Sequence, residues 1–280
     1  MVSKSMSNIR AVKQLTPYSA MSLEIIRIVS DDQVDMTDMV AVINKSPAIT
    51  ARILRCANSA YYGQRGRIST VREAIIRVLG LSITRGLTLA MALSNDFETG
   101  RVRYFDERRY WFNAVTTANI AQGLSHYVLH EDRPAPATAY TAGLIYNIGI
   151  QVLVHCFPEV MNQIFAHAPD SLKEQTHTQL GIDHHAASVL LAKNWDLPDI
   201  LCRAIGAQSG YEQEPITRIV SISAEMSDLA FTCSNVDLDA IEIDAELIEY
   251  KHVAKVMASV LNQRDNLFDM ANLIARTKKS

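Results

Sequence analysis

Two polar residues, Tyr146 and Asn147, interrupt the most apolar part of the chain. The 25 residues from Pro134 to Pro158 contain no Asp, Glu, Lys or Arg, so this segment is expected to lie deepest in the fold. A phenol with a pKa of about 10 and a neutral amide are poor metal ligands at neutral pH. Because burying either group unpaired costs on the order of 1 to 3 kcal/mol, we expect both to be hydrogen-bonded inside the protein.

Histidines occur in two patterns that bear on metal chemistry. His184 and His185 are adjacent, and on a helix their side chains point about 100° apart, so they cannot chelate one ion together. We expect one of them to be buried and hydrogen-bonded and the other to be exposed. His126 and His130, at i and i+4, could bind a metal on one helix face, although a solvated helix end is the favoured interpretation.

Arginines are concentrated between residues 50 and 90. One hypothesis is that part of this segment binds a nucleotide-like anion or an acidic partner, because a guanidinium makes bidentate contacts with phosphate and carboxylate. The alternative is that the arginines pair within the molecule with Asp31, Asp32, Asp35 and the acidic stretch at 237–249. With one acid, Glu73, and no lysine, the segment carries a net charge of +6 from Arg52, Arg55, Arg65, Arg67, Arg72, Arg77 and Arg85.

Helix signals run through the whole chain and must position these residues. Ser46 before Pro47 predicts a helix start, Thr70 and Glu73 have the spacing of a capping box, and Asp183 is expected to cap the helix that follows it. The apolar run is expected to form a core helix, or two helices broken near Asn147 to Gly149, and not a membrane span, because of its amides, histidine and prolines. No alternating segment is long enough for a sheet, so the sequence predicts an all-α fold.

The chain divides at a polar, glycine-bearing stretch near residues 96–106. We expect a mobile start at 1–14, a compact lobe of five short helices at about 15–97, and a second helical lobe at about 106–232 packed against it. The remaining residues, 233–280, are expected to form a helical extension with an acidic stretch, a last helix at about 245–260 and a basic tail.

Composition narrows the classes of function. With 27 basic and 30 acidic residues the net charge is −3, which argues against general nucleic-acid binding. The four cysteines lie far apart and show neither disulfide nor zinc spacing, and residues 1–15 lack the apolar core of a signal peptide. We therefore expect a cytoplasmic protein without a bound cofactor.

Two groups of motifs resemble the HDOD family, the HD-related output domains of bacterial signalling proteins. The first is SPAITARILRCANSAYYG with STVREAIIRVLGL behind it, and the second is AGLIYNIGIQVL followed by LGIDHHAASVLLAKNWDLP. The resemblance covers roughly residues 15–232. It implies a helical bundle related to the HD phosphohydrolases, enzymes that hold divalent metal with a first His, an adjacent His-Asp pair and a later Asp.

The resemblance also implies where those ligand positions lie in this chain. The His-Asp pair is replaced by Tyr146-Asn147, and the first His position falls on Asn113. His184 matches a family histidine, a later histidine position falls near Gln208, and the final acidic position matches Glu225. Only His184 and Glu225 could ligate a metal well. The set is therefore expected to be a degenerate site, without metal or catalytic residues.

We accordingly expect a non-catalytic signal-transduction module that works by binding a signalling protein in trans or a small ligand. An attached receiver, kinase or cyclase domain is not expected, and the sequence leaves a homo-oligomer open. The alternative is a metal-dependent phosphohydrolase with an altered site. If Tyr146 and Asn147 face an open cleft beside His184 and Glu225, a residual binding site becomes the better interpretation.

Overall fold

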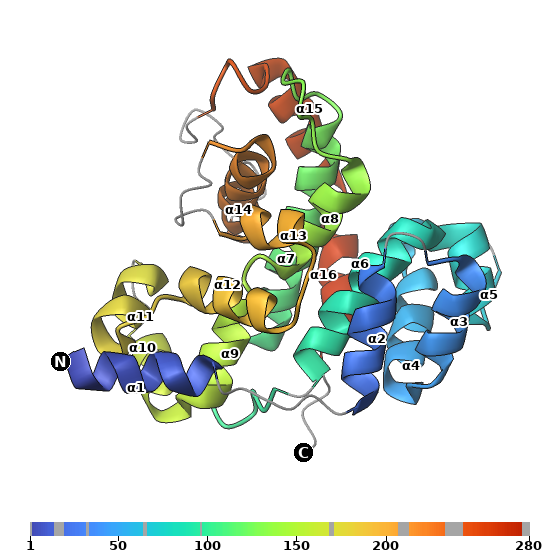
Figure 1. Ribbon diagram of the computed structural model, residues 1–280. Helices are drawn as coiled ribbons and strands as arrows, with labels where there is room; N and C mark the ends of the chain where they lie inside the picture. The colour runs from blue at the N-terminus through green and yellow to red at the C-terminus, as the bar shows by residue number, and fades with distance from the viewer. Residues whose placement is uncertain are drawn as a thin grey trace.

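Helices account for all the regular secondary structure that the computed structural model describes (Figure 1). It describes residues 2–13, 20–31, 34–63, 66–95, 97–167, 171–206, 213–232 and 243–275. Within these ranges no residue is in a strand, which confirms the prediction of an all-α fold. The helices gather into two lobes that meet along α6 and α8.

The N-terminal lobe consists of α2 to α6, which lie together on one side of the molecule (Figure 1). Side chains cap the N-termini of three of its helices. Asp35 caps α3, Ser46 caps α4, and Thr70 and Glu73 form a complete capping box at the start of α5. A π-helical turn, Ile75–Leu79, joins α5 to α6. The helices are α2 (Ala20–Ser30), α3 (Met36–Asn44), α4 (Pro47–Ala57), α5 (Val71–Ala74) and α6 (Gly80–Asn95), with a 3-10 turn at Ala60–Tyr62.

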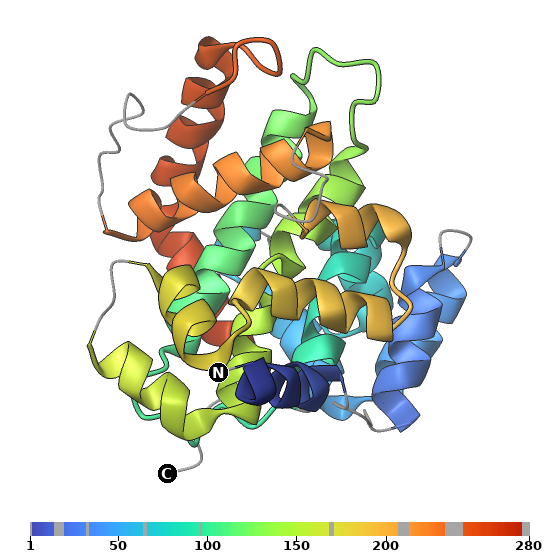
Figure 2. The ribbon, with the colours of Figure 1, turned by 60° about the vertical axis from the view of Figure 1, so that its left-hand side comes forward.

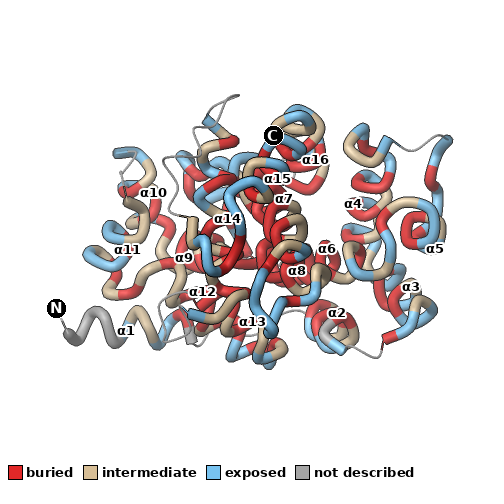
Figure 3. Tube along the Cα trace, turned by 90° about the horizontal axis from the view of Figure 1, so that it is seen from above, coloured by how far each residue is buried: buried red, intermediate tan, exposed pale blue. Residues whose placement is uncertain are grey.

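The C-terminal lobe is built around α7 (Glu107–Ser125), which packs against α8, α14 and the last two helices. Figure 3 shows buried residues concentrated along α7, α8 and α6, where the two lobes meet. Asp106 caps the N-terminus of α7, because its carboxylate accepts hydrogen bonds from the backbone N–H groups of Arg108 and Arg109. The other helices of the lobe are α8 (Pro136–Ile145), α9 (Ile148–Cys156), α10 (Pro158–Ala166), α11 (Leu172–Leu180), α12 (His184–Asn194), α13 (Asp199–Ala204) and α14 (Pro215–Thr232).

The apolar run forms α8 and α9, separated at Tyr146-Asn147 as the sequence predicts. Two stretches of the described chain, Val71–Asn95 and Pro136–Cys156, are long and apolar enough to cross a membrane by length and composition. Burial inside the protein accounts for the second, because 78% of its most apolar window is buried. Its Tyr140 is 1% exposed and packs against Gly86 of α6, so the run supplies the contact between the lobes.

Both ends of the described chain depart from expectation. The start, expected to be mobile, forms α1 (Val2–Lys13), which packs on α12 with Val12 fully buried (Figure 2). The Asn8 side chain donates a 2.9 Å hydrogen bond to the carbonyl of Leu180. At the other end, the expected single helix is two helices, α15 (Tyr250–Asn262) and α16 (Arg264–Ile274).

The last helix joins the two lobes. The ring of Phe268 stacks on Phe112 of α7 with 4.0 Å between ring centroids. Near the other end of α16, the Arg55 side chain of α4 donates a 3.2 Å hydrogen bond to the carbonyl of Leu273. Because α16 contacts α4 and α7 together, this helix belongs to the core packing of the domain.

Candidate functional site

The turn between α8 and α9 is held against α12 by one serine. The Ser188 hydroxyl accepts a 2.8 Å hydrogen bond from the backbone N–H of Gly149 and lies 3.0 Å from the carbonyls of Tyr146 and His184. A Cβ at Gly149 would lie 1.9 Å from the His184 carbonyl oxygen, so only glycine allows this approach. The packing places Tyr146, Asn147 and His184 side by side.

A second contact brings α7 and α14 together at the same place. The Asn113 amide donates a 2.6 Å hydrogen bond to the Asp228 carboxylate, although the two residues are 115 positions apart in sequence. The Ser227 hydroxyl donates a 3.1 Å hydrogen bond to the Asn113 carbonyl. Asn113 thus meets Asp228, three positions after the predicted Glu225.

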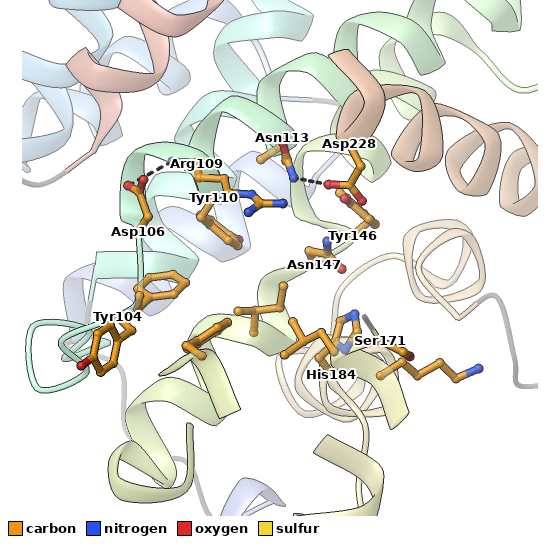
Figure 4. A pocket seen from close by; sticks show the side chains of 16 residues that line it. Tyr104, Asp106, Arg109, Tyr110, Asn113, Tyr146, Asn147, Ser171, His184 and Asp228 are labelled. Atoms are coloured by element: carbon orange, nitrogen blue, oxygen red, sulfur yellow. Dashed lines mark hydrogen bonds between the residues drawn. The ribbon is translucent and has the colours of Figure 1, made fainter. Parts of the chain in front are cut away.

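These residues line an open cleft with two adjoining cavities of about 570 and 310 Å³. Four residues, Tyr146, Asn147, His184 and Asp228, line both cavities, and Asn113 lines the larger one (Figure 4). The Asn147 amide oxygen is buried without a hydrogen-bond partner among the described residues. The prediction of complete internal hydrogen bonding is therefore wrong for Asn147, and the cleft fits the alternative of a residual binding site.

Burial sets the protonation states of the shared residues. It lowers the pKa of His184 to about 3, with further contributions from His185 and Lys173, so the imidazole is neutral at neutral pH. The same effect, assisted by Asp228, raises the pKa of the Tyr146 phenol well above its usual value. The pKa of Asp228 is also raised by burial, although Arg109 and the Asn113 hydrogen bond oppose the shift.

The histidine pair is arranged differently from the prediction. His184 is the buried member at 5% exposure, but its Nδ1 atom has no hydrogen-bond partner among the described residues. His185 is half-buried, and the centroids of the two rings lie 4.1 Å apart. His130 lies five residues after the end of α7, so it does not share a helix face with His126, and its imidazole accepts a 3.0 Å hydrogen bond from the backbone N–H of Asp132.

The donor set does not fit a divalent metal. In the described part of the chain no group of three or more His, Cys, Asp or Glu side chains is placed to hold an ion. At the first-His position Asn113 offers an N–H that is already donated to Asp228, and Tyr146 is a neutral phenol. Glu225 lines only the smaller cavity, and Gln208 lies outside the described residues.

Three residues of the cleft were missed by sequence reasoning: Arg109, Lys173 and Asp228. Asp228 lies one helical turn after Glu225, and residues at i and i+3 share a helix face, so the motif could have indicated either acid. Arg109 is in the first turn of α7, and Lys173 is in the first turn of α11. No local pattern connects these two segments to the cleft.

The arginine segment does not form a single patch. Arg52 is 5% exposed, with its guanidinium 5.5 Å from the centroid of the Trp111 ring. Arg55, Arg67 and Arg72 are exposed, and no ion pair joins them to an acid among the described residues. Arg65 lies outside that part of the chain. Arg55 and Arg67 border a separate surface hollow beside α4.

Three of the acids expected to neutralise these arginines have other partners. Asp35 accepts hydrogen bonds at the start of α3, and Asp244 forms an ion pair with Arg218. Glu249 forms an ion pair with Lys251. Ion pairing within the molecule is therefore not observed for Arg55, Arg67 and Arg72 in the described part of the chain.

The fold and the cleft define a class: a two-lobed helical protein with an open, polar-lined cleft in its C-terminal lobe. The model of the HDOD domain matches residues 15–211, and the chain belongs to the HDOD family. An uncharacterized protein of Treponema pallidum (strain Nichols) is 28% identical over 191 residues, which is 65% of this chain and 35% of that protein. The chain thus spans about a third of the length of this curated relative.

Solved structures share the fold. A proposed signal transduction protein from Marinobacter aquaeolei VT8 has a TM-score of 0.77 at 24% identity, over 97% of this chain and 66% of that one. A proposed phosphohydrolase from Shewanella amazonensis SB2B has a TM-score of 0.74 at 21% identity, over 96% and 98% of the two chains. An HDOD domain protein of unknown function from Geobacter sulfurreducens has a TM-score of 0.69 at 19% identity, over 96% and 99%.

Proposed function

We propose that this protein is a non-catalytic signal-transduction module of the bacterial cytoplasm that acts by binding a ligand in the cleft around Asn147. The observation that carries the proposal is the hydrogen bond from Asn113 to Asp228. It uses one carboxylate oxygen and the amide N–H of Asn113, the residue that the family resemblance matches to the first metal-binding histidine. Amide nitrogen is not a ligand for such ions, so the hydrogen bond closes this position to metal.

The cleft has the form of a binding site. Its larger cavity, about 570 Å³, falls in the size range of small-molecule pockets and combines aromatic walls with a few polar groups. A ligand group that paired with the Asn147 amide would satisfy a polar atom that the described residues leave unpaired. Binding there would therefore recover a cost that folding alone imposes.

The output would be delivered in trans, to another protein, through a surface of either lobe. Arg55, Arg67 and Arg72 supply an exposed cationic surface on the N-terminal lobe that suits an acidic partner. The hydrogen bond from Arg55 to Leu273 ties this surface to α16, which also packs on α7 beside the cleft. A ligand bound in the cleft would change the conformation of this surface through α7 and α16.

The competing function is a metal-dependent phosphohydrolase, favoured by the presence of His184, Glu225 and Asp228 around the smaller cavity. One experiment separates the two functions. The purified protein is loaded with Mn²⁺, Mg²⁺ or Zn²⁺, and metal retention and the hydrolysis of phosphate esters are measured beside ligand-induced thermal shifts. We expect no turnover, and thermal shifts that are lost in Asn147→Ala; metal-dependent turnover abolished by Asp228→Asn would overturn the proposal.

A further inference from the structure

The larger cavity has an aromatic end. Figure 4 shows Tyr104 and Tyr110 toward one side of the pocket, away from Asn147 and His184. Phe105 packs between Tyr110 and Phe165, with ring centroids 6.0 and 5.7 Å away, so the wall at this end is a cluster of rings. Tyr104 is 51% exposed at the rim, and the Arg103 guanidinium lies 5.6 Å from the centroid of its ring, so this ring can stack on a planar group.

Two cations face the cavity with unused hydrogen-bonding capacity. Arg109 and Lys173 come from α7 and α11, and neither side chain forms a hydrogen bond or ion pair with a described residue. The two carboxylates of the lining are both engaged: Asp106 accepts the backbone hydrogen bonds that begin α7, and Asp228 accepts from Asn113. The balance of free hydrogen-bonding groups therefore favours an anion.

The start of α11 adds to this preference. Ser171, Leu172 and Lys173 form the first turn of a nine-residue helix and line the same cavity. The exposed N–H groups of a helix N-terminus carry partial positive charge and attract anions. His184, 5% exposed and without a partner for Nδ1, lies at this end of the pocket in Figure 4.

The polar end also offers acceptors in a fixed orientation. A carboxylate only accepts hydrogen bonds, so the donation to Asp228 fixes the Asn113 amide with its nitrogen toward Asp228 and its oxygen away. That oxygen has no partner among the described residues, and neither has the Asn147 amide oxygen. Two unpaired acceptors beside a carboxylate suit a group that donates N–H bonds.

We propose that the larger cavity binds an aromatic anion: a planar ring that carries N–H donors and is linked to a phosphate or carboxylate. The ring lies against Tyr104 and Tyr110, its N–H groups pair with Asn113 and Asn147, and the anion is held by Arg109, Lys173 and the start of α11. This assignment rests on the proposed function and names the ligand chemistry of that cleft. A nucleoside monophosphate and a nitrogen-containing aromatic carboxylic acid share this chemistry.

The experiment is isothermal titration calorimetry with three kinds of probe. Guanosine monophosphate and indole-3-acetate represent the two sources of an aromatic anion, guanosine and indole are their uncharged counterparts, and inorganic phosphate and acetate are the anions alone. We expect at least one aromatic anion to bind at least about tenfold more tightly than both its uncharged counterpart and the anion alone, because each half supplies separate contacts. Which of the two binds identifies the source.

Variants locate the contacts. The pair Arg109→Gln and Lys173→Gln should weaken binding of the aromatic anion at least about tenfold, and Tyr104→Ala should weaken it while leaving the thermal stability unchanged. The matched controls are Arg108→Gln and Lys193→Gln. Arg108 is next to Arg109 on α7 and Lys193 is on α12, and both are exposed cations that do not line the cavity. The controls should bind as the wild-type protein does.

Three results would overturn the assignment. The first is that the uncharged ring binds as tightly as the aromatic anion, and the second is that phosphate or acetate alone binds as tightly as the aromatic anion. The third is that no probe binds. Failure of the proposed function gives a different result, namely metal-dependent hydrolysis of phosphate esters. If sugars or aliphatic amines raise the thermal stability and Asn147→Ala abolishes this effect, the proposed function is supported and the assignment of an aromatic anion as the ligand is contradicted.

Discussion

Asn113 of α7 and Asp228 of α14 are joined by a 2.6 Å hydrogen bond in the wall of the cleft. The first of these residues replaces a histidine of the HD pattern, and the second is an acid that could serve as a ligand. In their contact the Asn113 amide donates to the Asp228 carboxylate, so an amide at this position satisfies the acid beside it.

Restoring the ligand types should therefore restore metal binding. The combined substitutions Asn113→His, Tyr146→His and Asn147→Asp place imidazole and carboxylate beside Asp228, a donor set that divalent ions prefer. We expect this variant to retain Mn²⁺ or Zn²⁺ after gel filtration, measured by elemental analysis. Adding Asp228→Asn should abolish retention, whereas adding Glu225→Gln should not. The opposite pattern would identify Glu225 as the acidic ligand position.

Gly149 is expected to be among the least replaceable residues of the C-terminal lobe. In Gly149→Ala the new Cβ would lie 1.9 Å from the His184 carbonyl oxygen and 2.6 Å from the Ser188 nitrogen, both backbone atoms of α12. Moving that helix away should lower the free energy of unfolding by about 3 kcal/mol or more, measured by urea denaturation. Gly100→Ala is the control, because nothing lies within 4 Å of its Cβ position.

The contribution of the C-terminal extension can be measured at one ring. Phe268 stacks on Phe112 at 4.0 Å and contacts Phe231 at 5.4 Å, so Phe268→Ala removes packing that links α16 to α7 and α14. We expect a loss of about 3 kcal/mol of unfolding free energy. The adjacent exposed residue gives the control, since Asp269→Ala should change stability by less than about 0.5 kcal/mol. Equal effects of the two substitutions would contradict the packing of α16.

His184 should make the protein sensitive to acid. Its pKa is about 3 in the folded state against 6.5 for an ordinary histidine, so between these values the unfolded chain binds a proton that the folded protein does not. The stability from the neutral imidazole is complete above the ordinary pKa and is lost as the pH falls toward 3. The whole effect is on the order of 3 to 5 kcal/mol.

The variant His184→Asn isolates this contribution. Its unfolding free energy, compared with that of the wild-type protein from about pH 7 to about pH 4, should fall less steeply. His126→Gln, at an exposed position, should follow the wild-type curve. Parallel curves for wild type and His184→Asn would mean that the His184 ring titrates at its ordinary pKa in the folded protein.

Much of the fold could be predicted because its signals are local. The capping box at Thr70 and Glu73 and the cap at Asp183 act within one turn of helix, so a few residues suffice to place each helix start. The structure of the chain ends was harder to predict from the sequence. The polar segment that forms α1 contacts α12 and the backbone carbonyl of Leu180, and these long-range contacts leave no pattern in the local sequence. The division of the extension into α15 and α16 was missed as well.

The candidate site was predicted in part for the same reason. Tyr146, Asn147, Asn113 and His184 all line the cleft, and each was identified by its place in a motif. Arg109 and Lys173 belong to no motif and reach the cleft only because α7 and α11 converge there.

The sequence by itself determined where many of the helices begin and which segment is the core. Only the tertiary structure decided that Asp228 meets Asn113 and that Asn147 faces a cavity. Residues three apart on a helix lie on nearly the same face, so periodicity does not separate Glu225 from Asp228. The rotation of α14 separates them, and that rotation is fixed by its packing, including two hydrogen bonds of 2.6 and 2.8 Å from Arg264 to the carbonyls of Ala230 and Phe231.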